Sequence, residues 1–194
     1  MNITLDLIQE FRRRTGMGVM DSKQALKDSD GDIDKAMATM RLRGDKISQK
    51  KEGRVTKQGL VESYVHANRR VGSLVVLLCE SDFVARTDVF KNFAHEIALQ
   101  VAATNPAYIA PEDVPDSVIE EEKEIYRQQI DASKPADIQT KIINGKIDKY
   151  FQDRCLLKQV FVRDDSVTIE GLLKQKIAEL GENIKIQHIA RFEI

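Results

Sequence analysis

The side chains that most often carry out chemistry are few in this sequence. It has 3 histidines, His66, His95 and His188, and 2 cysteines, Cys79 and Cys155. No HExxH, CxxC or G-x-S-x-G pattern places any two of them together. We therefore predict no catalytic residue and no metal ligand, and interpret both cysteines as reduced core residues. A cysteine and a histidine brought together by folding would still form a nucleophile and a base, so an enzyme is kept as an alternative.

Nucleotide binding by the chain itself is also not predicted. The phosphate loop of nucleotide hydrolases reads G-x-x-x-x-G-K-[ST], and the stretch Asn144-Gly145-Lys146 lacks its first glycine and its final hydroxyl. Acids are concentrated at 120–124, but neighbouring residues of a helix point in different directions and do not converge on one metal ion. We predict no cofactor and no small-molecule substrate.

The composition is that of a soluble globular protein. Of the 194 residues, 42% are hydrophobic and 31% are charged. The 30 Lys and Arg residues are balanced by 31 Asp and Glu residues, so the basic excess that drives binding to nucleic acid is missing. No apolar run approaches the ~20 residues of a membrane helix, and the first residues do not resemble a secretion signal. We expect a cytoplasmic protein that binds neither nucleic acid nor a membrane.

A polar corner with an aromatic residue follows the most apolar stretch of the chain. The run 75–79 has the pattern of a buried strand, and the chain then turns through Ser81 and Asp82 without a glycine or a proline. Phe83 comes next, just before a helix that begins near Thr87. Side chains at such a corner are presented from a rigid base. Phe83 either folds back onto the core or projects as an anchor for another protein, and the residues alone leave both open.

A second candidate for partner contact lies near the N-terminus, in RTGMGVMDSKQAL. Two glycines flank Met17 between two predicted helices and allow a tight turn that projects Met17, Val19 and Met20. Methionine adapts well to a partner surface, but the same side chains would also close a small helical bundle. Both interpretations are kept.

The elements that position these residues follow from periodicity and helix-capping signals. Residues 1–44 predict a head of three short helices that ends at Gly44. A charged linker, 45–58, follows the head. The N-caps expected for the three helices are Thr4, Asp21 and Asp32.

The remainder, 59–194, predicts a core domain of mixed structure. Two strands around 60–67 and 71–79 form a hairpin, and the second is apolar on both faces, as in the centre of a sheet. Helices follow, and a last strand closes the chain. We predict an α+β protein with a small antiparallel sheet covered by helices. The last strand is expected to place one set of residues on one face: Ile184, Ile186, His188, Ala190 and Phe192.

Three blocks of the sequence resemble a known family. They are FRRRTGMGVMDSKQAL, VHANRRVGSLVVLLCESDFVARTDVFKNFAHEIALQVAATNP, and DRCLLKQVFVRD with the closing ARFEI. In this order and over essentially the whole chain they resemble bacterial-type elongation factor Ts in a short form. The resemblance implies a head like a ubiquitin-associated domain and a core that engages elongation factor Tu, the GTPase that delivers aminoacyl-tRNA. The role it implies is that of a guanine-nucleotide exchange factor that promotes release of GDP.

The resemblance also implies which residues bind the partner in its GDP-bound and nucleotide-free forms. Phe83 would enter an apolar gap of elongation factor Tu, and Asp82 would disturb the polar network behind the partner's magnesium ion. A further contact is implied for 172–180. The core residues of this site are Ser81, Asp82, Phe83 and Val84. The head residues are Arg12, Met17, Val19, Met20 and Lys23.

Some positions depart from the pattern of the family. Ser81 stands where threonine is usual, Phe11 where leucine is usual, and Lys158 where glutamate is usual. Serine keeps the hydroxyl group, whereas Lys158 reverses the charge. The alternative function is a ubiquitin-associated adaptor, which explains 1–44 and leaves the rest of the chain without a role.

Overall fold

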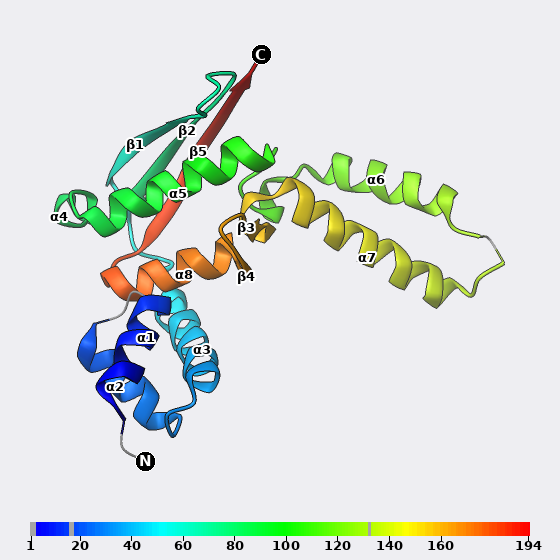
Figure 1. Ribbon diagram of the computed structural model, residues 1–194. Coiled ribbons are helices and arrows are strands. Elements are labelled where there is room, and N and C mark those ends of the chain that lie inside the picture. Colours follow the sequence, from blue (N-terminus) through cyan, green and yellow to red (C-terminus); the bar gives the residue numbers. More distant parts are fainter. Residues whose placement is uncertain (1–2, 16–17, 132) are drawn as a thin grey trace.

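The N-terminal residues form a bundle of three helices in the computed structural model, which describes residues 3–15, 18–131 and 133–194 (Figure 1). The helices are α1 (Leu5–Thr15), α2 (Val19–Asp28) and α3 (Ile33–Lys51). Their apolar faces meet in a small core of their own, as helical periodicity requires. Its buried members are Ile8, Phe11, Ala25, Leu26 and Ala36.

The helix starts agree with the sequence at Asp32 and differ at Asp21. The Asp32 side chain accepts a hydrogen bond from Lys35 N at 3.0 Å and caps α3. The start predicted at Asp21 is wrong, because α2 begins at Val19 with Gly18 as its N-cap. Asp21 lies instead in the first turn, where a negative charge complements the positive end of the helix dipole.

The helix end predicted at Gly44 is also wrong, because α3 continues to Lys51. Gly44 is buried, and a Cβ there would lie 3.8 Å from the carbonyl oxygen of Lys174 in α8 (Ile169–Leu180). That distance is an ordinary van der Waals contact, so the position does not require glycine; the packing of α8 against α3 supports α3 beyond the bundle. The division into a head of 1–44, a linker of 45–58 and a core of 59–194 stays a prediction, as does the likeness of the head to ubiquitin-associated domains.

The sheet is antiparallel and has the strand order β1-β2-β5. Its strands are β1 (Gln58–Val65), β2 (Val71–Cys79) and β5 (Ile184–Glu193). The central position predicted for β2 is confirmed. A bulge interrupts the β2–β5 pairing between Val76 and Leu77 and changes the face on which the residues of β5 lie. The prediction of one shared face for the last strand is therefore wrong: Ile184 and Ile186 are buried, whereas His188 and Phe192 are exposed.

Helices cover one face of the sheet, as predicted for an α+β protein. The main one is α5 (Asp88–Thr104), which lies along β1 and β2 (Figure 1). The helix α8 packs between α3 on one side and the core on the other. Sheet and helices enclose one large apolar cluster that includes Leu77, Phe90, Phe93 and Ile177.

A two-helix arm extends from the core on the side opposite the short helix α4 (Figure 1). It consists of α6 (Asp116–Gln129) and α7 (Ala136–Arg154). The turn η1 (Pro111–Asp113) leads into the arm, and the turn η2 (Leu156–Lys158) leads out of it to the hairpin β3 (Val160–Phe161) and β4 (Asp164–Thr168). Among the described residues, no helix combines the length and apolarity needed to cross a membrane.

Candidate partner-binding site

The polar corner joins the central strand β2 to a single helical turn, α4 (Asp82–Ala85). Ser81 is the N-cap, and its hydroxyl oxygen accepts a hydrogen bond from Val84 N at 3.4 Å. On the other side, the Thr87 hydroxyl donates to Val84 O at 2.8 Å and accepts from Phe90 N at 3.3 Å. The backbone is thus fixed on both sides of the corner.

Phe83 projects from this corner into solvent. Its side chain is 80% exposed, whereas Val84 and Ala85 are partly buried and pack against the apolar core. The interpretation of Phe83 as a core residue is therefore wrong for the free chain. A large aromatic side chain held out on a fixed backbone is available to a partner without rearrangement of the core.

The charge of Asp82 is not isolated on this surface. Asp82 Oδ2 lies 2.9 Å from Arg86 Nη2, one turn further along, and both side chains are exposed enough to reach a partner. The sequence analysis did not single out Arg86. Its i,i+4 spacing from Asp82 was the available signal.

The turn between α8 and β5, which is remote in sequence, is hydrogen-bonded to the corner. The Glu182 carboxylate accepts hydrogen bonds from Glu80 N at 3.1 Å, Ser81 N at 2.9 Å and the Ser81 hydroxyl at 2.6 Å. In return, Asn183 N donates to Glu80 Oε1 at 2.7 Å. This bond and the nearby Arg54 guanidinium lower the pKa of Glu80. Sequence analysis missed Glu182 and Asn183, because no local pattern links residues about 100 positions apart.

The head residues divide into those that the structure describes and one that it does not. Met20 is 76% exposed and Val19 is 49% exposed, so neither closes the bundle. Arg12 and Lys23 also lie at the surface. Met17 lies outside the described residues. The structure therefore leaves Val19 and Met20 accessible to a partner.

The apolar residues of 172–180 do not add to this surface. Leu172 and Ile177 are buried, and Leu173 and Leu180 pack against the same core. The helix α8 uses its apolar face inside the protein, so only its polar face is accessible.

Lys158 takes part in a network that joins α8 to α3. Lys158 Nζ lies 2.8 Å from Glu170 Oε2, and Lys174 Nζ lies 2.8 Å from Glu170 Oε1 and 3.2 Å from Asp45 Oδ1. The two lysines, Lys158 first, lower the pKa of Glu170. The lysine that departs from the family pattern therefore has a partner within the chain.

The residues considered for catalysis are not assembled into a catalytic site. His95 Nδ1 lies 3.1 Å from Glu62 Oε1, and His66 Nδ1 lies 3.1 Å from the Tyr64 hydroxyl. Both histidines are exposed. The two cysteines are buried, and burial raises the pKa of each thiol to about 11. Within the described part of the chain, no group of acids, histidines and cysteines has the arrangement needed to hold a metal ion.

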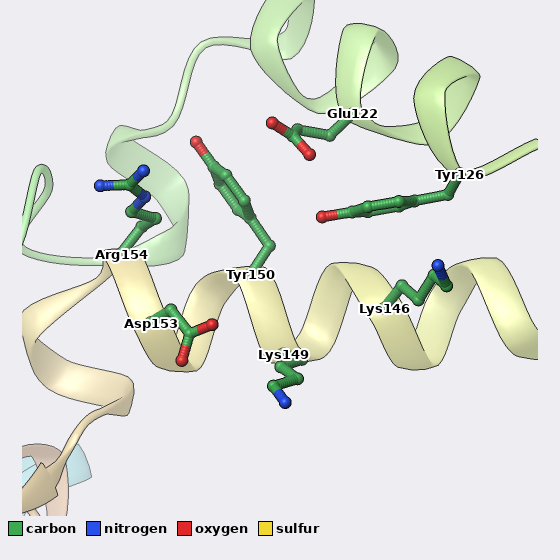
Figure 2. Close-up of a pocket in the computed structure, with 7 residues that line it drawn as sticks. All are labelled: Glu122, Tyr126, Lys146, Lys149, Tyr150, Asp153 and Arg154. Carbon is green, nitrogen blue, oxygen red and sulfur yellow. The ribbon is translucent and has the colours of Figure 1, made fainter. Parts of the chain in front are cut away.

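A polar cleft lies between α6 and α7, in the arm and away from the corner (Figures 1 and 2). Lys146 Nζ lies 5.0 Å from the centre of the Tyr126 ring and donates to Gln129 Oε1 at 2.7 Å. Burial raises the pKa of Tyr126 to about 12, and a hydrogen bond with Glu122 adds to this shift. These pairs join the two helices, so we interpret the cleft as part of the packing interface between α6 and α7 in the arm. Its volume is about 530 Å³, and it is lined by Glu122, Tyr126, Lys146, Lys149, Tyr150, Asp153 and Arg154.

The fold and the exposed corner between β2 and α4 together define a class of protein that acts by binding a partner. It is an α+β protein with a three-helix N-terminal bundle that presents an exposed aromatic residue on a rigid corner at the end of its central strand.

Comparison with known proteins then gives the family. A family model described as Elongation factor TS matches residues 19–194. A relative named elongation factor Ts from Thermotoga neapolitana is 47% identical over 194 residues, which are 100% of this chain and 98% of that protein. Its namesake from Fervidobacterium nodosum is 48% identical over 195 residues, 100% of this chain and 99% of the relative. The namesake from Carboxydothermus hydrogenoformans is 46% identical over 193 residues, 99% of this chain and 89% of the relative.

The chain therefore belongs to the elongation factor Ts family. Membership of this family makes it a nucleotide-exchange factor of translation elongation.

Proposed function

We propose that this chain promotes release of GDP from elongation factor Tu in the cytoplasm, by inserting the corner of Asp82 and Phe83 into the GTPase. The observation that carries the proposal is the exposure of Phe83, which is 80% accessible on a backbone fixed by Ser81 and Thr87. Such a factor acts by binding and needs no catalytic residue of its own.

The physical basis is competition between two ligands of one GTPase. GDP is held largely through its phosphates and a magnesium ion, whose octahedral coordination tolerates little displacement. Burial of the Phe83 ring in an apolar gap contributes roughly 1.5 to 3 kcal/mol, available only when the partner opens to receive it. Asp82 acts beside it on the polar network behind the magnesium ion.

Coupling between the two ligands is reciprocal. The factor by which this chain lowers the affinity of elongation factor Tu for GDP equals the factor by which GDP lowers the affinity for this chain. The chain therefore binds the nucleotide-free partner tightly and the GDP-bound partner weakly. The exposed head residues Val19 and Met20, together with Arg12 and Lys23, hold the nucleotide domain of the partner and orient the corner.

The test is the release of fluorescently labelled GDP from elongation factor Tu, with and without this chain. Phe83→Ala is expected to slow the stimulated release at least several-fold, as for the ~2 kcal/mol lost at an interface anchor. Because Phe83 is exposed, the far-ultraviolet circular dichroism and the Tm of the variant are expected to match those of the parent chain. Undiminished stimulation by Phe83→Ala would overturn the proposal.

A further inference from the structure

The corner that carries Phe83 is held by one carboxylate from a residue about 100 positions further along the chain, Glu182. Glu182 lies two residues after the end of α8, in the turn before β5. Its Oε2 accepts from Glu80 N at 3.1 Å and from Ser81 N at 2.9 Å, and its Oε1 accepts from the Ser81 hydroxyl at 2.6 Å. Three donors converge on one negative side chain, and hydrogen bonds to an ionised acceptor are the strong ones.

The bond to the Ser81 hydroxyl also determines how α4 is capped. A carboxylate only accepts, so the Ser81 proton is committed to Glu182 and the lone pairs of Ser81 Oγ are left for Val84 N. The cap is weak by itself, with a distance of 3.4 Å. The helix has only 4 residues, too few for a helix to be stable alone. Its conformation therefore depends on contacts with the rest of the chain, and those of Ser81 hold its N-terminal end.

The turn that carries Glu182 is itself fixed. Gly181 ends α8 with a φ of 74°, in the left-handed region that glycine adopts easily. The Asn183 side-chain amide is buried and donates to Glu52 O at 3.2 Å and Arg54 O at 2.9 Å, while its backbone N–H donates to Glu80 Oε1 at 2.7 Å. Glu182 thus acts from a turn that cannot easily move away from the corner.

We propose that Glu182 is a positioning residue for nucleotide exchange: it fixes the direction in which Phe83 leaves the corner. The inference rests on the proposed function, since it assumes that Phe83 enters the partner. Without the carboxylate, two backbone N–H groups lose their acceptor and the Ser81 hydroxyl is free to rotate. The Phe83 ring then samples several directions. Ordering the ring on each encounter with the partner costs conformational entropy, which weakens binding.

The test compares Glu182→Gln with a control of equal charge change. The glutamine side chain keeps the size of Glu182, but its amide NH2 group replaces one of the two acceptor oxygens. Either the two backbone N–H groups, which share Oε2, or the Ser81 hydroxyl, which binds Oε1, then loses its acceptor. We expect Glu182→Gln to lower the rate of stimulated GDP release about five- to tenfold, within the range for residues that act through others. Glu124→Gln removes the same charge from α6, where Glu124 is paired with Arg127 at 2.9 Å in the arm, and is expected to leave the rate unchanged.

A double-mutant cycle with Phe83→Ala separates positioning from a general structural role. If Glu182 acts through Phe83, Glu182→Gln costs nothing further in the Phe83→Ala background. A similar loss in both backgrounds, or an unchanged rate after Glu182→Gln alone, would overturn the inference. If Glu182→Gln lowers the Tm enough to prevent the measurement, Ser81→Ala removes one of the three bonds from the other side and is expected to slow release to a smaller extent.

A spectroscopic signal reports the position of the corner without the partner. The chain contains no tryptophan, so Phe83→Trp places a single indole at the corner. We expect its time-resolved fluorescence anisotropy to decay faster when Glu182→Gln is added and to stay unchanged when Glu124→Gln is added. If Phe83→Ala has no effect on GDP release, the proposed function fails. If the anisotropy of Phe83→Trp decays equally fast with and without Glu182→Gln, the positioning role of Glu182 is refuted.

Discussion

Asp82 Oδ2 lies 2.9 Å from Arg86 Nη2, so the acidic group of the corner is already paired before any partner arrives. Both side chains are well exposed, and solvent-exposed ion pairs contribute little to stability. The pair does, however, compete with any contact that Asp82 makes to elongation factor Tu. Arg86 is therefore expected to restrain the activity of the corner.

The first prediction concerns this restraint. Arg86→Ala is expected to raise the rate of stimulated GDP release about two- to fivefold, equivalent to the ~0.5 to 1 kcal/mol of an exposed ion pair. The Tm is expected to change little. Arg127→Ala removes an exposed arginine paired with Glu124 in the arm and serves as the control, with no effect on release. A lower rate after Arg86→Ala would show that Arg86 itself binds the partner.

The second prediction concerns the head. Met20→Ala is expected to raise the concentration of this chain needed for half-maximal GDP release several-fold, for a loss of ~1 kcal/mol or more at a contact. The free chain should keep its stability to within ~0.5 kcal/mol, because Met20 is 76% exposed. Leu5→Ala is the matched control, since Leu5 is 74% exposed in α1 and is not proposed to contact the partner.

The same variants test the adaptor alternative. Titration of the chain with ubiquitin, followed by nuclear magnetic resonance, is expected to leave the signals of Val19 and Met20 unchanged. Shifts at these two residues, combined with GDP release that Met20→Ala leaves unchanged, would favour an adaptor over a head that holds the GTPase.

The third prediction concerns the ion pairs of Glu170 in α8. Lys158→Glu, which restores the residue usual in the family, is expected to destabilise this chain by about 1 kcal/mol in urea unfolding near neutral pH. The variant loses the pair with Glu170 and places two carboxylates 12 positions apart in contact. Lys158→Gln removes the pair without the repulsion and should cost less.

The pH dependence of this effect has a defined sign. The pKa of Glu170 is lowered from 4.5 by Lys158 and then Lys174. Its stabilising contribution is therefore present above about pH 4.5 and is lost as the pH falls through the folded-state pKa. The stability difference between the parent chain and Lys158→Glu should shrink below that pH, and a difference that persists in acid would contradict an electrostatic cause.

The fourth prediction concerns the two thiols. Cys79 and Cys155 are fully buried, and burial raises the pKa of each to about 11. Because the thiolate is the reactive form, the folded chain is expected to resist iodoacetamide near pH 8 and to react only on unfolding in denaturant. GDP release should be unchanged after the treatment. Rapid alkylation of the folded chain with loss of activity would instead revive a cysteine nucleophile.

Local patterns predicted much of the fold, because they depend on neighbours along the chain. The run 75–79 is apolar on both faces and could be satisfied only in the centre of a sheet, which is where β2 lies. Asp32 caps a helix through a bond to a residue three positions away. The corner at Ser81 was predicted for the same reason, since a buried strand and an amphipathic helix flank a short polar stretch.

Features that depend on remote neighbours were decided by the tertiary structure. Alternation in β5 predicted one apolar face, but the bulge opposite Val76 and Leu77 leaves Ile184 and Ile186 buried and turns Phe192 outward, 67% exposed. Gly44 has the chemistry of a helix end, yet α3 continues because α8 packs against it.

The corner shows both contributions at one residue. Local patterns place Phe83 at a turn between a strand and a helix, and they leave the direction of the ring open. Packing in the folded chain turns Val84 and Ala85 inward, brings Glu182 to the backbone of Ser81 and leaves Phe83 facing solvent. The direction of a side chain at a turn depends on which neighbours fill the space beside it. Here one of those neighbours, Glu182, lies about 100 residues further along the chain.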